Sequence, residues 1–276
     1  MHTLPTRARA GLVVLLLILG VSLASPLLLS HAPGEVLGTD TLRLAPPSWQ
    51  LPLGTDEYSR DVLARMLGGA RISLTFGLLA AAVAAFFGTV VGLIAALARS
   101  AVDRVLMSAV DVGLSVPRLL LLIVVTAAFG RLAWPVLAVA MGACSWFPLA
   151  RLVRARAREL VAGDFSVAAR ALGAPLPRIA WRHLMPNLAG TIAAATVLAF
   201  AHAVTLEAAL SFLGQGVPIP VPSWGSLINE GRQFATVAPR LVVIPSIAIV
   251  ATVLAAGALA DGVERGLPWR GAGARV

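Results

Sequence analysis

The chain has 276 residues, 58% of them hydrophobic, and its mean hydropathy is +0.88, which exceeds what a soluble core requires and predicts a polytopic membrane protein. All 22 basic residues are arginine and the net charge is +9; beside apolar segments, such arginines indicate membrane topology and not nucleic-acid binding. Because lysine is absent, the chain can form neither a Walker-type phosphate loop nor a Schiff base.

Six charge-poor segments are long enough to cross a bilayer as helices. We expect transmembrane helices at residues 11–29, 72–98, 105–129, 132–150, 188–206 and 241–260. The first gives about 28 Å of helix against a hydrocarbon core of roughly 30 Å. It is longer than the apolar region of a usual signal peptide, so we favour an uncleaved helix. The predicted fold class is all-α, with about six transmembrane helices.

Residues 31–71 follow the first helix and are rich in proline, glycine and acids, so we expect them outside the membrane. Residues 31–52 could be a plain connecting loop. A short amphipathic helix near the outer interface is predicted over residues 57–67, from the helical spacing of Tyr58, Val62, Leu63 and Met66.

The second helix carries a Gly-x-x-x-Gly pattern at Gly88 and Gly92, which favours close packing against this chain or another permease. The third is the least regular, because Pro117 can kink it. Asp111 and Arg118 are seven residues apart, which would place them on one helix face. They could be an arginine reaching the headgroups beside an acid, or a functional pair.

The fourth segment contains Cys144, the only cysteine of the chain, which excludes an internal disulfide and a cysteine cluster for a metal. Residues 207–240 follow the fifth helix and contain several prolines and glycines, so they cannot cross lipid as a helix. We expect them at the outer interface or over the mouth of the bundle. At the preceding helix end, His202 and Glu207 could line a substrate path or simply be hydrated, and the sequence leaves both open.

The distribution of arginines predicts the orientation. With both termini inside, fourteen arginines are cytoplasmic and seven are outside, with Arg118 uncounted. Seven of the fourteen lie between Arg151 and Asn187, which places this segment in the cytosol. There, Asp164 or Ser166 can cap one short helix, Gly173 suits its left-handed end, and Pro177 can open a second.

This cytosolic segment carries the first of three motifs that identify a family. The run Val167-Ala168-Ala169, then Gly173, then Leu184-Met185-Pro186, resembles the EAA loop of the membrane subunits of ABC importers. In that pattern the first residue is Glu, whereas this chain has Val167. The departure bears on how an ATPase would dock.

Two further motifs sharpen the resemblance, and with the first they cover most of the chain. Residues 53–65 with 69–74, and residues 207–216 with 222–225, resemble the dipeptide, oligopeptide and nickel permease group. In the first of these, Ser59 stands where the family usually has Gly before Arg-Asp.

The resemblance implies a type I-like permease fold in the bacterial cytoplasmic membrane, with no cofactor. It also implies four kinds of partner: the lipid bilayer, a second, non-identical permease, two ATP-binding subunits and an extracytoplasmic substrate-binding protein. The ATPase-coupling residues would be Asp164, Phe165, Val167, Ala168, Ala169, Arg170, Leu172 and Gly173. The outer gate or binding-protein contact would include Asp56, Arg60, Asp61, Phe212 and Trp224.

The expected organisation has three parts. Residues 1–70 form the first helix and an extracytoplasmic segment. Residues 71–264 form the permease core with a coupling loop at 151–187 and an outer loop at 207–240, and residues 265–276 form a cytoplasmic tail. Peptides, nickel complexes or another small solute could be the substrate.

Other classes of function predict other features. The sequence has no Gly-x-Ser-x-Gly and no His-Glu-x-x-His motif, so we expect no enzyme. An ion-coupled secondary transporter is the main alternative, because Asp111, Arg118, His202 and Glu207 could carry protons. It would require two related halves, and no convincing repeat is present. A structural membrane scaffold, which would have no ATPase partner, is the third possibility.

Overall fold

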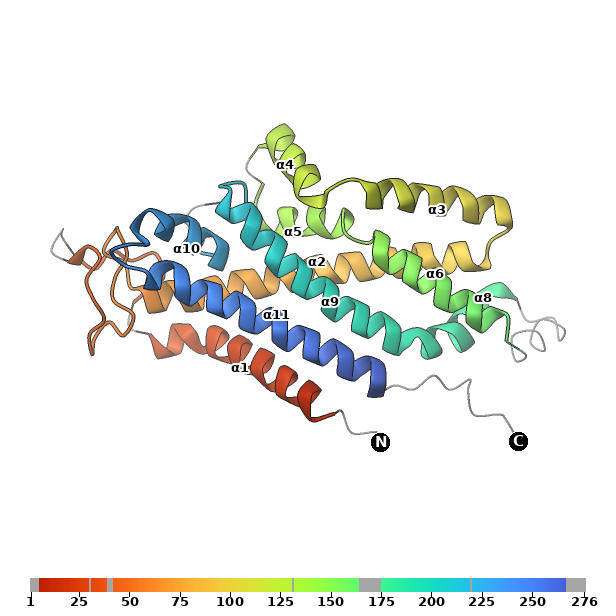
Figure 1. The fold of residues 1–276 in the computed structure, drawn as a ribbon, viewed down its shortest axis with the longest axis horizontal. Coiled ribbons are helices and arrows are strands. Elements are labelled where there is room, and N and C mark those ends of the chain that lie inside the picture. Colours follow the sequence, from red (N-terminus) through yellow and green to blue (C-terminus); the bar gives the residue numbers. More distant parts are fainter. Residues whose placement is uncertain are drawn as a thin grey trace.

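The computed structural model describes residues 5–29, 31–38, 42–130, 132–163, 175–218 and 220–266, and its regular secondary structure there is helical apart from two isolated β-bridges. Four long helices run along an elongated bundle (Figure 1): α1 (Thr6–Leu28), α2 (Val62–Leu97), α9 (Met185–Phe212) and α11 (Arg240–Gly266). Shorter helices complete it: α3 (Ser100–Ser115), α4 (Arg118–Phe129), α5 (Trp134–Ala143), α6 (Phe147–Val161), α8 (Leu176–Ile179), a π-helix (Ala180–Leu184), α10 (Trp224–Gly231) and a 3₁₀ turn (Arg232–Phe234).

These helices confirm the all-α membrane fold. Within the described ranges, four helices are long and apolar enough to cross a membrane unbroken. Two bent pairs could each add one span, α3 with α4 at 85° and α5 with α6 at 42°, which makes up to six.

The bend between α3 and α4 lies at Pro117, as the sequence predicts, because proline has no N–H to continue the hydrogen-bond ladder. The bend separates Asp111 from Arg118, so the expectation that they share one helix face is wrong. Asp111 instead contacts Arg151 of α6.

The start of α2 differs from prediction, because no separate amphipathic helix covers residues 57–67. Residues 57–59 form a turn, and Arg60 and Asp61 lie in isolated β-bridges. Asp61 then begins a single helix of 36 residues by accepting a hydrogen bond from the backbone N–H of Leu63 at 2.8 Å. No proline follows until after the helix ends at Leu97, so nothing interrupts it. The helix crosses residue 70, the expected boundary between the first two parts, and that division stays a prediction.

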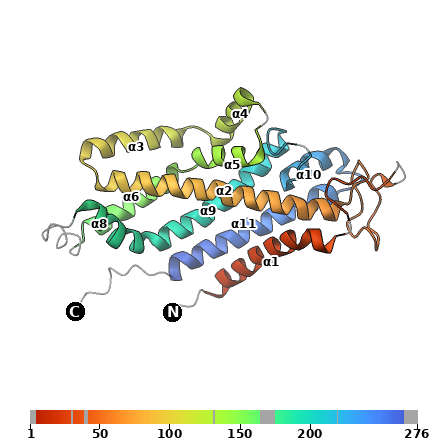
Figure 2. The same cartoon turned by 180° about the vertical axis from the view of Figure 1, so that it is seen from behind.

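In the packing of the bundle, α2 is central and contacts α5, α6 and α9, while α11 packs between α9 and α1. In Figures 1 and 2, α1 and α11 lie along one edge of the bundle and α3 with α4 along the opposite edge. Large apolar side chains such as Leu16, Leu17 and Leu254 are exposed on this outer surface. Exposed apolar side chains on long apolar helices are typical of contact with lipid.

The Gly-x-x-x-Gly pattern packs within the chain. A Cβ at Gly88 would lie 2.7 Å from the side chain of Leu149, and one at Gly92 would lie 2.7 Å from the carbonyl oxygen of Ala150. Both contacts are with α6, so the two glycines let α2 and α6 approach closely. The sequence left open whether these glycines pack against this chain or against another permease; in the structure they pack against α6 of this chain.

The two ends of the bundle differ. Helix α1 begins, and α2, α6 and α11 end, toward one end, which we call the α6 end. Helix α10 and residues 31–38 and 42–61 lie at the other, the α10 end, as Figure 2 shows from behind. Both ends of the described chain are therefore toward the α6 end.

Gly92→Leu should destabilise the isolated chain by about 1–3 kcal/mol, because the side chain would have to displace the backbone of α6. The measurement is thermal unfolding in detergent. Gly20→Leu is the matched control, since a Cβ at Gly20 of α1 meets nothing within 4 Å. Equal unfolding temperatures for the two variants would contradict the packing.

Candidate functional site

A cluster of buried charges ties α2 to α10 at the α10 end. The guanidinium of Arg65, which is 2% exposed, donates from Nη1 to Asp56 Oδ2 at 2.5 Å and to Glu230 Oε2 at 2.7 Å. Its Nη2 donates to Glu230 Oε1 at 3.0 Å. Arg60 bridges the same two acids, with 2.7 Å to each. We call these four residues the outer charge cluster.

Asp56 organises the loop that carries it. Its Oδ1 accepts the backbone N–H groups of Tyr58 and Arg60, each at 2.9 Å, while its Oδ2 faces the two arginines. A carboxylate bonded in this way fixes both the turn and the position of the charges. The predicted pair Asp56 and Arg60 therefore comes together, in a cluster whose other members the sequence analysis did not single out.

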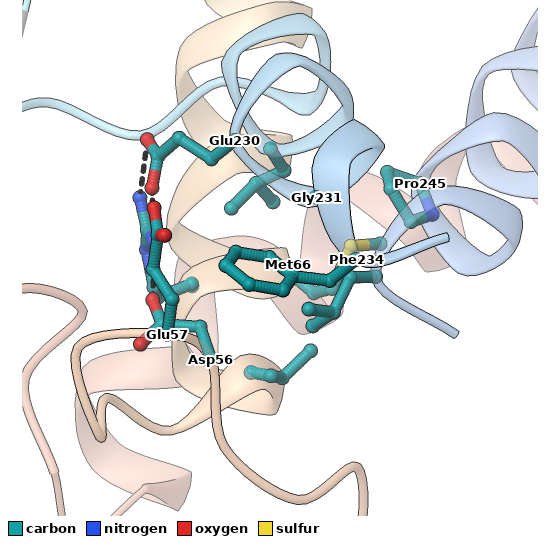
Figure 3. A pocket seen from close by; sticks show the side chains of 11 residues that line it. Asp56, Glu57, Met66, Glu230, Gly231, Phe234 and Pro245 are labelled. Carbon is teal, nitrogen blue, oxygen red and sulfur yellow. Dashed lines mark hydrogen bonds and ion pairs between the residues drawn. The ribbon is translucent and has the colours of Figure 1, made fainter. Parts of the chain in front are cut away.

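A cavity of about 20 Å³ lies beside the cluster (Figure 3). Asp56 and Glu230 are on one side of it, opposite Phe234. Within the described ranges, the buried Nε of Arg65 has no acceptor. The volume is enough for about one water molecule and far too small for a solute. The outer charge cluster therefore joins helices and holds no substrate.

The other predicted outer residues lie apart from the cluster. Asp61 caps α2, and its Oδ2 is 3.7 Å from His31 Nδ1. Trp224 is only 1% exposed; its indole N–H donates to the carbonyl of Met66 at 3.2 Å. Phe212 is 39% exposed and lies against the guanidinium of Arg232. Of these three, Phe212 presents its side chain outward, whereas Trp224 fixes α10 on α2.

Glu207 is fully buried in α9 among hydroxyl groups. Ser211 donates to its Oε1 at 2.7 Å and Ser73 to its Oε2 at 3.2 Å. The hydroxyl of Ser73 also accepts the backbone N–H of Trp224 at 3.1 Å. For Glu207 neither alternative from the sequence fits, because its carboxyl group is fully buried and connects α9, α2 and α10; His202, by contrast, is exposed on α9.

The loop before α2 is held in a fixed shape, and for residues 42–52 this excludes a plain connecting loop. Arg240, the first residue of α11, donates to the carbonyls of Ala45 at 2.8 Å and Leu53 at 3.0 Å. Gly54 has φ +70°, and a Cβ there would lie 2.3 Å from the carbonyl oxygen of Ala45. A glycine is therefore required at this position.

Ser59 also has a positive φ, 58°. This explains why a glycine suits the position in the family pattern, because a left-handed conformation is costly for a residue with a Cβ. The serine retains the turn between Asp56 and Arg60, with its backbone N–H bonded to the carbonyl of Asp56 at 3.2 Å.

A second charge cluster lies at the α6 end, and we call it the inner clamp. Asp103 of α3 is buried and accepts hydrogen bonds from Nε and Nη2 of Arg154, the latter at 2.7 Å, and from Arg158 Nη2 at 2.6 Å. Both arginines belong to α6, the helix that leads to residues 164–174. The clamp therefore fixes the helix from which that segment departs.

The eight predicted coupling residues lie at 164–173, outside the described residues. On the far side of that segment, a helix begins near Pro177 as predicted, but it is not a separate short helix. Helix α8 passes through the π-helix into α9 without a break, so Leu184-Met185-Pro186 lies inside a continuous helical run. Arg178, Trp181 and Arg182 are exposed on its first turns.

The structure thus consists of a helical bundle with an apolar outer surface. At one end, the loop before α2 is hydrogen-bonded to α10 and α11, and at the other end the first turns of the α8–α9 run expose basic side chains. Residues 88–267 match the family model described as the inner membrane component of binding-protein-dependent transport systems. The chain belongs to this permease family. It is therefore a multi-pass inner membrane permease of the ABC importer class, and the family is one of transport permeases, not of enzymes.

Relatives match nearly the whole chain. A putative peptide permease protein of Brucella suis is 36% identical over 257 residues, covering 92% of this chain and 84% of the relative. A putative peptide transport system permease protein of the same organism is 36% identical over 258 residues, covering 93% and 85%. The dipeptide transport system permease protein DppC of Alkalihalophilus pseudofirmus is 34% identical over 261 residues, covering 94% and 84%.

Replacing Ser59 tests the strained turn of this permease. Ser59→Gly should be more stable than Ser59→Ala by about 1 kcal/mol, because both variants lack the hydroxyl and only alanine keeps a Cβ at positive φ. Thermal unfolding of both variants in detergent measures the difference. If the alanine variant were as stable as the glycine variant, Ser59 would not hold a left-handed conformation.

Proposed function

We propose that this chain is one of two non-identical permeases of an ABC importer for peptides. A binding protein would deliver the peptide from outside, and two ATP-binding subunits would energise transport. The observation that carries the substrate class is the similarity over more than nine-tenths of the chain to relatives named as peptide and dipeptide permeases. Among the substrates left open by the sequence, this favours peptides over nickel complexes.

The proposed orientation has both termini in the cytoplasm. Two observations support it: arginines predominate two to one on the side assigned to the cytosol, and α1 begins and α11 ends toward the α6 end. In this orientation the outer charge cluster faces the binding protein and the inner clamp faces the ATPases. Tyr58 and Phe212, exposed at the α10 end, are suitable contacts for a binding protein.

The alternative of an ion-coupled secondary transporter is disfavoured, because the family is described by its dependence on a binding protein. The buried acid Glu207 gives it no support either, since its carboxyl group is hydrogen-bonded between three helical elements. Transport without a binding protein would require a substrate pocket in the permease itself.

Reconstitution tests the function. The chain should be co-expressed with the proteins of adjacent genes and placed in proteoliposomes that contain ATP. We expect import of a labelled dipeptide only when the second permease, both ATPases and the loaded binding protein are all present. The chain alone should hydrolyse no ATP. Import driven by an ion gradient without ATP would contradict the proposal.

The proposed docking segment runs from Asp164 to Gly173 and follows the helix that the inner clamp fixes. Because Val167 replaces the family's Glu, docking would depend on apolar contact from Phe165, Val167 and Leu172, with Arg170 meeting acids of the ATPase. An exposed ion pair contributes only about 0–1 kcal/mol, so its loss is tolerable where apolar contact replaces it.

Val167→Arg should abolish co-purification of the ATPase, because an unpaired charge in the interface costs several kcal/mol. Val167→Ala is the control and should only weaken recovery, since it removes apolar area without adding charge. The measurement is the amount of ATPase retained on tagged permease. Undiminished recovery with the arginine variant would remove Val167 from the docking surface.

A further inference from the structure

Both bent helix pairs break beside one cavity of about 230 Å³. Its lining includes Arg118, the first residue after the α3–α4 break, and Ser145, within the α5–α6 break. His202 of α9 contributes the third polar side chain, and leucines supply much of the apolar wall. Broken helices at membrane depth are tolerated where they line a cavity.

Arg118 differs from Arg151, Arg154 and Arg158 of α6, which pair with the acids of α3. The acids of α3 are already paired, Asp103 with Arg154 and Arg158 of α6, and Asp111 with Arg151. Within the described ranges, the side chains of Arg118 and His202 have neither an ion pair nor a hydrogen bond, and the cavity lining contains no acid. The cavity therefore has an excess of positive charge.

The place of this charge in a candidate membrane span makes it informative. Helix α3 has 16 residues, or about 24 Å, between its start at the α6 end and the break before Arg118. With α4 it forms one candidate broken membrane span, and Arg118 lies at the break. A guanidinium inside a membrane span is costly without a partner and marks a functional site by default.

We propose that this cavity binds the C-terminal carboxylate of a peptide in transit, with Arg118 as the principal group and His202 as a second donor. The inference rests on the proposed function as a peptide importer. A planar guanidinium can donate two parallel hydrogen bonds to a carboxylate. The volume is below the roughly 300–1,000 Å³ of a complete ligand pocket, so the cavity takes the terminal residue and leaves the remainder of the peptide outside it.

Peptide imported per ATP hydrolysed is the measurement that tests the site, with the complete transporter in proteoliposomes and alanyl-alanine as the probe. Arg118→Gln should lower this ratio at least tenfold, while the loaded binding protein still stimulates ATP hydrolysis. Arg118→Lys should retain most of the import because it keeps the charge. Arg104→Gln, which removes an exposed arginine of α3 outside the cavity, is the matched control and should leave the ratio unchanged.

The two proposals fail differently. Absence of peptide import by the unmodified transporter would overturn the peptide function and this site with it. Normal import per ATP in Arg118→Gln would overturn only the site. If that variant does not assemble, His202→Ala decides, because His202 is exposed and the variant should fold. We expect at least a threefold lower ratio, and an unchanged ratio would overturn the site.

Discussion

Burial of the Arg65 guanidinium is the constraint on which the α10 end of the permease depends. A buried arginine is tolerable only when acids surround it, and removing one acid from such a pair typically costs about 3–5 kcal/mol. Asp56 comes from the loop before α2 and Glu230 from α10, 165 residues after Arg65. The cluster therefore sets the position of both segments relative to α2. Trp224 and Glu207 add hydrogen bonds between the same helices, because both bond to residues of α2. Helices α2, α9 and α10 are therefore joined as one unit.

The inner clamp has the same design at the opposite end. Asp103 is buried and accepts from two arginines of α6, which fixes the start of α3 against the end of α6. Close approach of α2 and α6 at Gly88 and Gly92 supports the same pair of helices along their length. Displacement of the segment after α6 would therefore move α6 and α3 together, and with them the break beside Arg118.

Most of the fold could be predicted because it depends on local chemistry. Apolar length predicts the spans, and Pro117 predicts the bend. The start of α2 was missed, although Asp61 is a local capping residue. Arg65 has a sequence signal, since a charge inside an apolar helix requires a partner, but nothing local identifies Glu230 as that partner. The size of the α3–α4 bend is also not local, and it decides that Asp111 pairs with α6. The motif residues at 164–173 came from family resemblance, and their interpretation as a docking segment stays a prediction.

The proposed site beside Arg118 would contact only one end of a peptide, which suits a permease of a binding-protein-dependent family. The cavity beside Arg118 holds about 230 Å³, which is below the size of a complete ligand pocket, and His202 also lines a larger cavity of about 790 Å³ between α1, α9 and α11. A site that bound peptide tightly at membrane depth would slow its release, whereas a partial site that contacts one charged end orients the peptide without retaining it. Affinity can then come from a separate binding protein.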